Sequence, residues 1–312
     1  MKNIARWITK NKIFVILLLP GLLWIVFFFL IPLFLLLAIS FGQKEAIIDI
    51  SYEWNIQNYI RSIQGVYVIT MLKSIIVSAL TTITCLVIAI PVAFFISFSN
   101  KRIKFILLIA IMLPLWTNLL IRTYSLIAIL RTKGHINGTI EYLWQTSYNI
   151  QNFFGLSEKK LIGEYYTPIE LLHNNFSVII GLFYIYVPFM IIPIYLVLEK
   201  FDKDMLEASY DLGASNSKTF LRVIIPNISP GIISGIILVF IPCMGSFIIP
   251  DLLGGTNSQM IGNIIERQFK SANDWPFGAA LSFILLYITI ILFSIRYIYA
   301  VFYSPSKTRR IY

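Results

Sequence analysis

Long apolar runs alternate with short polar segments along the whole chain. A bilayer core needs roughly 20 mainly apolar residues per helix, and six segments meet this requirement. The predicted spans are approximately residues 13–41, 68–98, 103–129, 176–198, 230–249 and 277–302. The pattern predicts an all-α integral membrane protein with six transmembrane helices, folded as one domain over residues 1–312.

Lysine and arginine gather in every second connection between these spans. The basic segments are the N-terminus, residues 100–104, residues 200–222 and the C-terminal tail. Cytoplasmic loops carry this excess of positive charge in membrane proteins. We therefore expect both termini on the cytoplasmic side, with the loops near 42–67, 130–175 and 250–276 outside. The long middle loop contains weak helical patterns of its own.

Composition supports a membrane protein and limits the other classes. Hydrophobic residues make up 58% of the chain and charged residues 13%, whereas a soluble domain carries roughly 25% charged residues. The net charge of +10 could indicate nucleic-acid binding. Because the basic residues form short clusters between apolar runs, we expect them to face anionic membrane lipid instead, and we expect no nucleic-acid partner.

The sequence shows no pattern typical of a metal site or of a reactive cysteine. Cys85 and Cys243 each lie inside an apolar run, without a neighbour at metal-binding or CxxC spacing. His135 and His173 lie in one polar loop, and no HExxH pattern is present. We expect two buried cysteines and no metal or cofactor bound by this chain.

The polar loop over residues 200–226 carries the most informative pattern. Asp204, followed three residues later by Glu207, is typical of a capping box and predicts a helix start. Gly213 can adopt the left-handed conformation that closes a helix. Ser215 or Ser217 can cap a second helix, and Pro226 permits a bend before the fifth span. The pattern predicts a helix, a glycine turn and another helix, with little side-chain bulk on one side.

This loop resembles the EAA loop of bacterial ABC importer permeases. That motif is Glu-Ala-Ala, a glycine four residues later, nine further residues, and Ile-x-Leu-Pro. The corresponding residues are Glu207-Ala208-Ser209, Gly213 and Val223-Ile224-Ile225-Pro226, with Ser, Val and Ile replacing Ala, Ile and Leu. The resemblance implies the type I ABC importer permease fold. It also implies that Glu207, Ala208, Ser209, Gly213 and Pro226 couple the membrane spans to a cytoplasmic ATPase. An ordinary capped amphipathic helix is the alternative, but it does not require this glycine and proline spacing.

Further segments resemble spermidine/putrescine permeases of the PotB type. They are Leu113–Tyr124, Pro250–Gly255, Met260–Asn263 and Asp274–Ala280. The resemblance implies an importer in the bacterial plasma membrane, with two different permease chains, an ATPase dimer and an extracellular polyamine-binding protein. The chain has no Gly-x-x-x-x-Gly-Lys-Ser/Thr segment, so we expect ATP and Mg²⁺ to be bound by the ATPase.

A polyamine path needs carboxylates for the ammonium groups and aromatic faces for cation–π contacts. The spans lack acidic residues near their midpoints, so we expect a weakly binding, aromatic-lined path with an acidic outer mouth. The candidates are Trp116, Tyr184, Phe240, Asp251 and Trp275, although lipid-facing or core packing is an alternative for each aromatic residue. The acidic mouth would also include Glu164, Glu170, Glu266 and Asp274.

Arg122 lies inside the third predicted span, where an ionisable residue is usually paired or functional. We expect a structural ion pair, with Asp251 as one candidate partner, or a contact with the binding protein. Three rival functions share parts of the pattern. They are a permease for another solute such as iron or thiamine, an ion-driven secondary transporter, and an intramembrane enzyme. The last two normally need charged groups or a reactive cluster inside the spans, and only Arg122 fits such a role.

Overall fold

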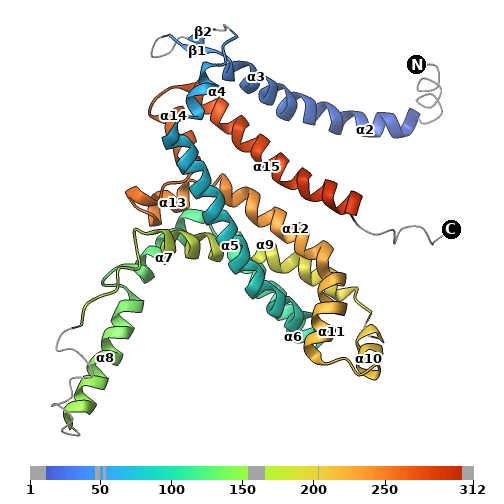
Figure 1. The fold of residues 1–312 in the computed structure, drawn as a ribbon, viewed down its shortest axis with the longest axis vertical. Coiled ribbons are helices and arrows are strands. Elements are labelled where there is room, and N and C mark those ends of the chain that lie inside the picture. The colour runs from blue at the N-terminus through green and yellow to red at the C-terminus, as the bar shows by residue number, and fades with distance from the viewer. Residues whose placement is uncertain (1–11, 46–49, 52–53, 154–165, 203, 304–312) are drawn as a thin grey trace. The chain divides into compact units, whose positions relative to one another are not determined.

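A computed structural model describes residues 12–45, 50–51, 54–153, 166–202 and 204–303 (Figure 1). The described chain is mostly helical, as predicted, and forms two compact units. The first unit comprises Met1–Val68 and Ile264–Tyr312, and the second comprises Ile69–Asn263. Five described helices are long and apolar enough to cross a membrane, or six if one bent pair counts as a single span.

The first unit contains the first and last spans. Its elements are α2 (Lys12–Ile25), η1 (Val26–Leu30), α3 (Ile31–Ser40), β1 (Gln43–Lys44), β2 (Ile50–Ser51), α4 (Gln57–Ser62) and α15 (Trp275–Tyr303). The short antiparallel hairpin pairs Gln43 with Ser51 and was not predicted. Helix α15 packs against α3 and α4. Helices α5 (Gly65–Phe98) and α14 (Ile261–Lys270) connect the two units in the chain.

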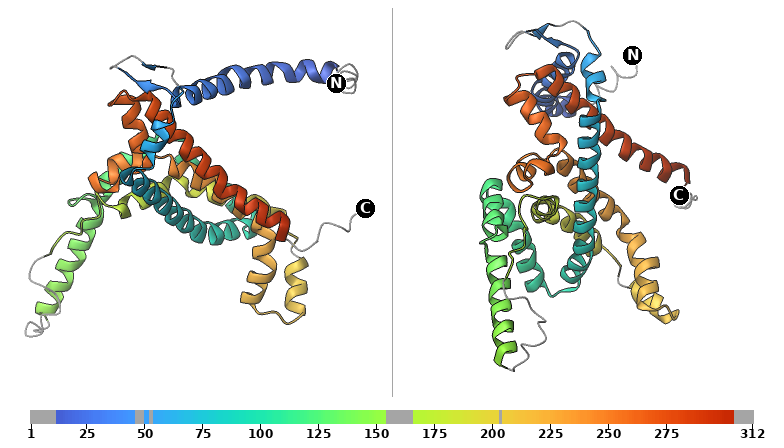
Figure 2. Two further views of the ribbon diagram at one scale, coloured as in Figure 1. Left: turned by 45° about the horizontal axis from the view of Figure 1, so that its top comes forward. Right: turned by 60° about the vertical axis from the view of Figure 1, so that its left-hand side comes forward.

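The second unit contains the remaining spans (Figures 1 and 2). After α5 come α6 (Lys101–Met112), η2 (Leu113–Trp116), α7 (Leu119–Leu130), α8 (His135–Phe153), α9 (Asn175–Glu199), α10 (Asp204–Asp211), α11 (Asn216–Thr219), η4 (Phe220–Ile224), α12 (Ile225–Met244), α13 (Ile248–Leu253) and η5 (Thr256–Ser258). Helix α8 is the helical part of the long loop. The predicted Glu164 lies outside the described residues.

The core of this unit lies between α9 and α12, which pack along one another. Two glycines of α12 make this close approach possible. A Cβ at Gly231 would lie 2.8 Å from the backbone oxygen of Pro193, and a Cβ at Gly235 would lie 2.5 Å from the sulfur of Met190. Buried Cys85 and Cys243 are free thiols in the same core, as expected for small apolar residues.

The third predicted span is not a single straight helix. Helix α6 and η2 end at Trp116, and the helical stretch Leu119–Asn149, which begins with α7, is inclined to them by 99°. Pro114 cannot donate a backbone hydrogen bond, and the side chain of Thr117 donates to its carbonyl oxygen at 2.7 Å. Asn118 then caps α7 by accepting from Leu120 N at 2.8 Å. The apolar pattern alone did not reveal this break, because every residue around it except Thr117 and Asn118 is apolar or proline.

The fifth predicted span, 230–249, is shifted toward the N-terminus in the structure. A helical stretch runs from Asn216 to Met244, and the following segment turns into the short helix α13. A tight network holds this segment against α9: Leu253 O accepts from His173 N at 2.8 Å and from Ser177 Oγ at 2.7 Å. The polar loop and the fifth span are therefore continuous rather than separate elements.

Candidate coupling surface and translocation path

Helix α10 and the start of the following helix form an elbow over residues 204–224, which we call the coupling elbow. Gly213 lies at its tip with φ +75°, the left-handed conformation predicted from the sequence. Its N–H donates to Tyr210 O at 2.8 Å, and Ala214 N donates to Ser209 O at 3.0 Å. These bonds close α10 in the manner of a glycine C-cap. The glycine is required by the backbone conformation, since nothing lies within 4 Å of a Cβ placed there.

The ends of the two helices differ from the predicted caps. Helix α10 begins at Asp204, but the Asp204 backbone amide donates to the side chain of Asp202 at 3.1 Å. Asp202 therefore takes the role that the predicted capping box gave to Asp204. Ser215 occupies the N-cap position of α11 with an extended backbone, but its side chain forms no capping hydrogen bond. The predicted helix boundaries are correct, whereas the predicted capping atoms are not.

Ser209 does not contribute to an open, low-bulk surface. Its side chain is buried inside the elbow, and its hydroxyl lies 2.8 Å from the hydroxyl of Thr219. Ser209 Oγ also lies 3.0 Å from Leu206 O. The buried pair joins α10 to α11 across the glycine turn. This pair could not be predicted from the motif, because Thr219 lies at one of its unspecified positions between Gly213 and Val223.

The outward face of the elbow carries an acidic residue and apolar side chains. Glu207 and Ala208 are exposed. Met205 and Tyr210 are also exposed, and Leu212 beside the glycine is 88% exposed. A leucine this accessible at the tip of a polar loop is unfavourable in water. This face can bury Leu212 and Tyr210 only against another surface.

Pro226 follows a widened turn at the base of the elbow. The N–H of Ile225 donates to Phe220 O, five residues back, which defines the π-helical turn η4. Proline cannot donate to the carbonyl four residues before it and crowds that carbonyl. The wider turn accommodates this defect, so the helix continues into α12. The same arrangement occurs in the first span, where Ile31 N donates to Val26 O just before Pro32.

The predicted path residues lie on different elements. Trp116 at the end of η2 is 86% exposed, Tyr184 on α9 is exposed, and Phe240 on α12 is half-buried. Asp251 is an exposed residue of α13. These four belong to the second unit. Trp275 belongs to the first unit, where its ring packs edge-on against Phe269 with centroids 6.0 Å apart.

Arg122 on α7 is half-buried. The Nε and Nη1 atoms are buried and have no hydrogen-bond partner in the part of the chain that the structure describes. These two N–H groups therefore do not form the predicted ion pair with Asp251. Buried charged donors of this kind are normally satisfied, so an acceptor from outside the described residues is expected.

The comparison with known families identifies the chain. Residues 68–303 match the family described as the inner membrane component of binding-protein-dependent transport systems. The chain belongs to this family. It is thus a permease component of a transport system rather than an enzyme, and a multi-pass protein of the membrane.

Relatives of this permease are similar along most of its length. It is 38% identical over 262 residues to a spermidine/putrescine transport system permease protein, PotB, of Escherichia coli strain K12, covering 84% of this chain and 88% of the relative. The PotB of Haemophilus influenzae is 37% identical over 274 residues, with 88% and 89% of the two chains covered. The match to PotB-type permeases expected from the third and fifth-to-sixth span motifs is confirmed.

Solved structures with the same fold are more distant in sequence. A chain of a bacterial ABC transporter involved in alginate import superposes with a TM-score of 0.64 at 15% identity, covering 93% of this permease and 95% of that chain. A second alginate transporter, in complex with an alginate-bound periplasmic protein, gives 0.67 at 14% identity and covers 95% and 96%. These similarities confirm the predicted ABC importer permease fold.

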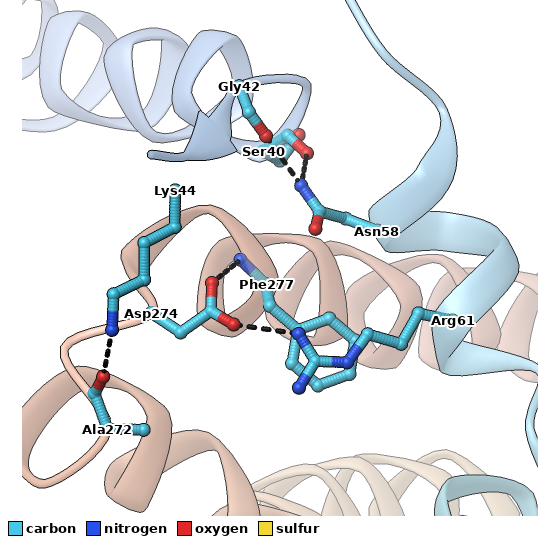
Figure 3. A network of polar contacts seen from close by, with 8 residues as sticks. All are labelled: Ser40, Gly42, Lys44, Asn58, Arg61, Ala272, Asp274 and Phe277. Atoms are coloured by element: carbon cyan, nitrogen blue, oxygen red, sulfur yellow. Dashed lines mark hydrogen bonds and ion pairs between the residues drawn. The ribbon is translucent and has the colours of Figure 1, made fainter. Parts of the chain in front are cut away.

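An ion pair in the first unit of the permease involves Asp274, one of the carboxylates predicted for the acidic outer mouth (Figure 3). Asp274 accepts from Arg61 at 2.8 Å and from the backbone N–H of Phe277 at 3.3 Å, at the start of α15. The Arg61 guanidinium lies 4.0 Å from the centre of the Phe277 ring. Burial lowers the pKa of Arg61, but the hydrogen bond and charge of Asp274 outweigh it and raise this pKa.

Two of the predicted acidic residues are therefore already neutralised. Asp274 is engaged by Arg61, and Glu266 pairs with Lys270 at 2.9 Å. Neither carboxylate is a free ligand for an ammonium group. The role of Arg61 was not predicted, since a lone arginine in an outer loop gives no pairing signal for a partner more than 200 residues away.

Proposed function

We propose that this permease is one of two membrane-spanning subunits of an ATP-driven polyamine importer, with spermidine and putrescine as its substrate class. Its PotB relatives, at 37–38% identity over more than four fifths of the chain, carry this proposal. The other components are a second permease, an ATPase dimer that binds ATP and Mg²⁺, and an extracellular polyamine-binding protein. The complex lies in the bacterial plasma membrane with both termini of this chain in the cytoplasm.

The coupling elbow is the docking surface for the ATPase in this proposal. Its exposed face offers Leu212 and Tyr210 as apolar anchors and Glu207 as a charged contact. Apolar and aromatic anchors of this kind dominate interface energetics. The helical stretch from Asn216 to Met244 is continuous with the elbow, so a movement of the elbow reaches the core helix α12 directly.

A pull-down from detergent-solubilised membranes tests this docking. Leu212→Asp places a charge where the interface buries an apolar side chain, and we expect at least a tenfold loss of co-purified ATPase. Lys218→Ala on the other arm of the elbow is the matched control and should retain the ATPase. Full retention of the ATPase by Leu212→Asp would refute docking through this face.

Substrate transfer follows a weakly binding route past aromatic faces. Trp116 and Tyr184 expose their rings and Phe240 is half-buried, and such rings attract ammonium groups by cation–π contacts worth about 0.5–2 kcal/mol each. A conduit of this kind leaves tight recognition to the binding protein. Asp251, an exposed residue of α13, provides a carboxylate for the same route.

Uptake of radiolabelled spermidine and putrescine in a strain deleted for this permease tests the substrate class. The native chain should restore ATP-dependent uptake of at least one of the two, while Gly213→Val should not, because a β-branched residue opposes the left-handed conformation. Immunoblots of membranes control for expression. Unchanged polyamine uptake in the deletion strain, with impaired uptake of iron or thiamine, would assign the permease to another solute.

Arg122 contributes to assembly in this proposal. Its two unsatisfied buried N–H groups would be met by a carbonyl or carboxylate of a neighbouring subunit. Arg122→Ala should reduce co-purification of the second permease or docking of the binding protein. The ratio of spermidine to putrescine uptake should stay unchanged, and an altered ratio with normal assembly would contradict this role.

A further inference from the structure

A basic cleft lies where α7 ends and α8 begins. Its volume is about 380 Å³, and it is lined by Ala128, Arg131, Lys133, Gly134, His135, Gly138, Thr139 and Tyr142. Arg131 and Lys133 are cationic, and no carboxylate lines the cleft. Two cations with a phenol beside them favour an oxygen-rich anion.

The cleft is held in shape by a buried polar network. The Asn137 side chain is only 2% exposed. Its amide nitrogen donates to Ile169 O at 3.0 Å, and its amide oxygen accepts from Ile169 N and from the Tyr166 hydroxyl, both at 2.9 Å. These bonds fix the first turn of α8 to the segment that leads into α9. The cleft is therefore built into the fold rather than formed by loose surface side chains.

Gly134 closes the turn on the other side. A Cβ at this position would lie 2.5 Å from Ile129 O and 2.7 Å from Arg131 O, so no side chain fits there. Gly134 N donates to Arg131 O at 2.7 Å, and Gly138 N donates to Gly134 O at 2.9 Å. The tight turn brings the end of α7 and the beginning of α8 together. The first backbone N–H groups of α8 add their partial positive charge to this end of the cleft.

The position of the cleft along the chain indicates where its ligand comes from. Helix α7 exposes large apolar side chains such as Ile121, Tyr124 and Ile129, as a lipid-facing helix does. The cleft begins at the last turn of α7, where the apolar stretch ends and polar residues begin. Lipid headgroups lie at this level of a membrane protein, and Trp144 on α8 and Tyr142 are typical of the same interfacial layer.

Three other described cations predicted to lie on this side of the membrane have partners within the protein. Lys44 donates to Ala272 O, Arg61 pairs with Asp274, and Lys270 pairs with Glu266. The side chains of Arg131 and Lys133 have no ion-pair partner among the described residues. Their mutual repulsion would be relieved by a bound anion.

We propose that this cleft binds the phosphate headgroup of an anionic phospholipid, with Arg131 and Lys133 as its charged ligands and the Tyr142 hydroxyl as a hydrogen-bond donor. The acyl chains lie along the exposed apolar side of α7. The lipid would then fix the junction of the broken third span and α8 at the membrane surface.

Thermal unfolding of the purified permease, titrated with a short-chain phosphatidylglycerol, tests the proposal. The anionic lipid should stabilise the protein, and the zwitterionic phosphatidylcholine of the same chain length should not. Removing both charges in R131Q/K133Q should weaken binding about 25-fold, roughly fivefold for each cation near a membrane surface. K270Q, which removes a cation elsewhere, is the matched control and should bind as the native chain does.

Two further measurements test the position of the site and distinguish a lipid from a free anion. Thr139→Asp puts a negative charge into the cleft and should also abolish the response to phosphatidylglycerol. Inorganic phosphate at the same concentration should stabilise far less than the lipid. Equal stabilisation by inorganic phosphate would replace the lipid by a free anion, and undiminished lipid binding by R131Q/K133Q and Thr139→Asp would overturn the site.

Discussion

Ser209 stands where the EAA motif has alanine, and its hydroxyl is buried against that of Thr219. Alanine would leave an apolar interior between the two arms of the elbow, whereas serine brings a hydroxyl that needs a partner. Thr219 supplies that partner at 2.8 Å. A buried hydroxyl left without its partner costs about 1–3 kcal/mol, while removing both can be nearly neutral.

This asymmetry predicts the outcome of a double-mutant cycle. Ser209→Ala and Thr219→Val should each lower the thermal stability of the purified permease, by about 1–2 kcal/mol at most. The double variant should recover much of the loss. Differential scanning fluorimetry of the four proteins measures the coupling, and strictly additive losses would mean that the two hydroxyls act independently.

The ion pair at the start of α15 makes a second prediction at the same scale. Asp274→Asn keeps a side chain that can cap the helix but removes the charge that Arg61 faces. Because Arg61 is partly exposed, we expect a modest loss of stability, about 1 kcal/mol. Glu266→Gln, which breaks an exposed pair within α14, is the control and should change the melting temperature less. An equal effect of the two substitutions would argue against a special role for Asp274.

Helices α9 and α12 approach one another through glycines that differ in what surrounds them. At Gly231 the nearest atoms are backbone atoms of Pro193 and Ile194, which cannot move without shifting α9. At Gly235 the nearest atom is the sulfur at the flexible end of Met190. Packed interiors tolerate a side-chain adjustment better than a backbone shift.

A graded series of glycine substitutions follows from this difference. Gly231→Ala should destabilise the permease most, by about 1–3 kcal/mol, and Gly235→Ala should cost less. Gly65→Ala, at the start of α5 where nothing lies within 4 Å, should be tolerated. Yields of monodisperse protein and melting temperatures of the three variants report the order. A reversed order for Gly231 and Gly235 would contradict the packing described here.

The predictability of each element depended on whether its signal was local. Long apolar runs predicted helices such as α9 and α15 within a few residues, and Gly213 predicted the turn at the tip of the elbow. The break at Thr117-Asn118 was missed because a short polar interruption does not lower the hydropathy of the run. Arg61 and Thr219 were missed because their partners are distant in sequence, and pattern analysis carries no information on such contacts.

At the scale of the whole molecule, the distribution of positive charge predicts which surfaces face the cytoplasm. Ser217 lies on the coupling elbow and Tyr142 on α8, and both are exposed. The native thiols Cys85 and Cys243 are buried and provide a low background for labelling experiments.

Labelling of intact cells with a membrane-impermeant maleimide tests this arrangement. Tyr142→Cys should react in intact cells, whereas Ser217→Cys should react only after the membrane is permeabilised. The native chain, with its two buried thiols, is the control in both conditions. Reaction of Ser217→Cys in intact cells would place the elbow outside and would exclude its contact with a cytoplasmic ATPase.

The 99° turn in the third span also bears on how the chain enters the membrane during synthesis. Helix α6 with 12 residues continues into the 4 residues of η2, and α7 has 12 residues. The two halves are therefore only about 24 Å and about 18 Å long, whereas the hydrocarbon core is about 30 Å thick. Neither half is long enough to be released into lipid by itself as a stable span. We therefore expect the insertion machinery to retain this region until α9 and α13, which contact α7, have been synthesised. On this expectation, the third span folds only after the later helices that contact it have been made. The helices of this permease are then not inserted one by one as independent units.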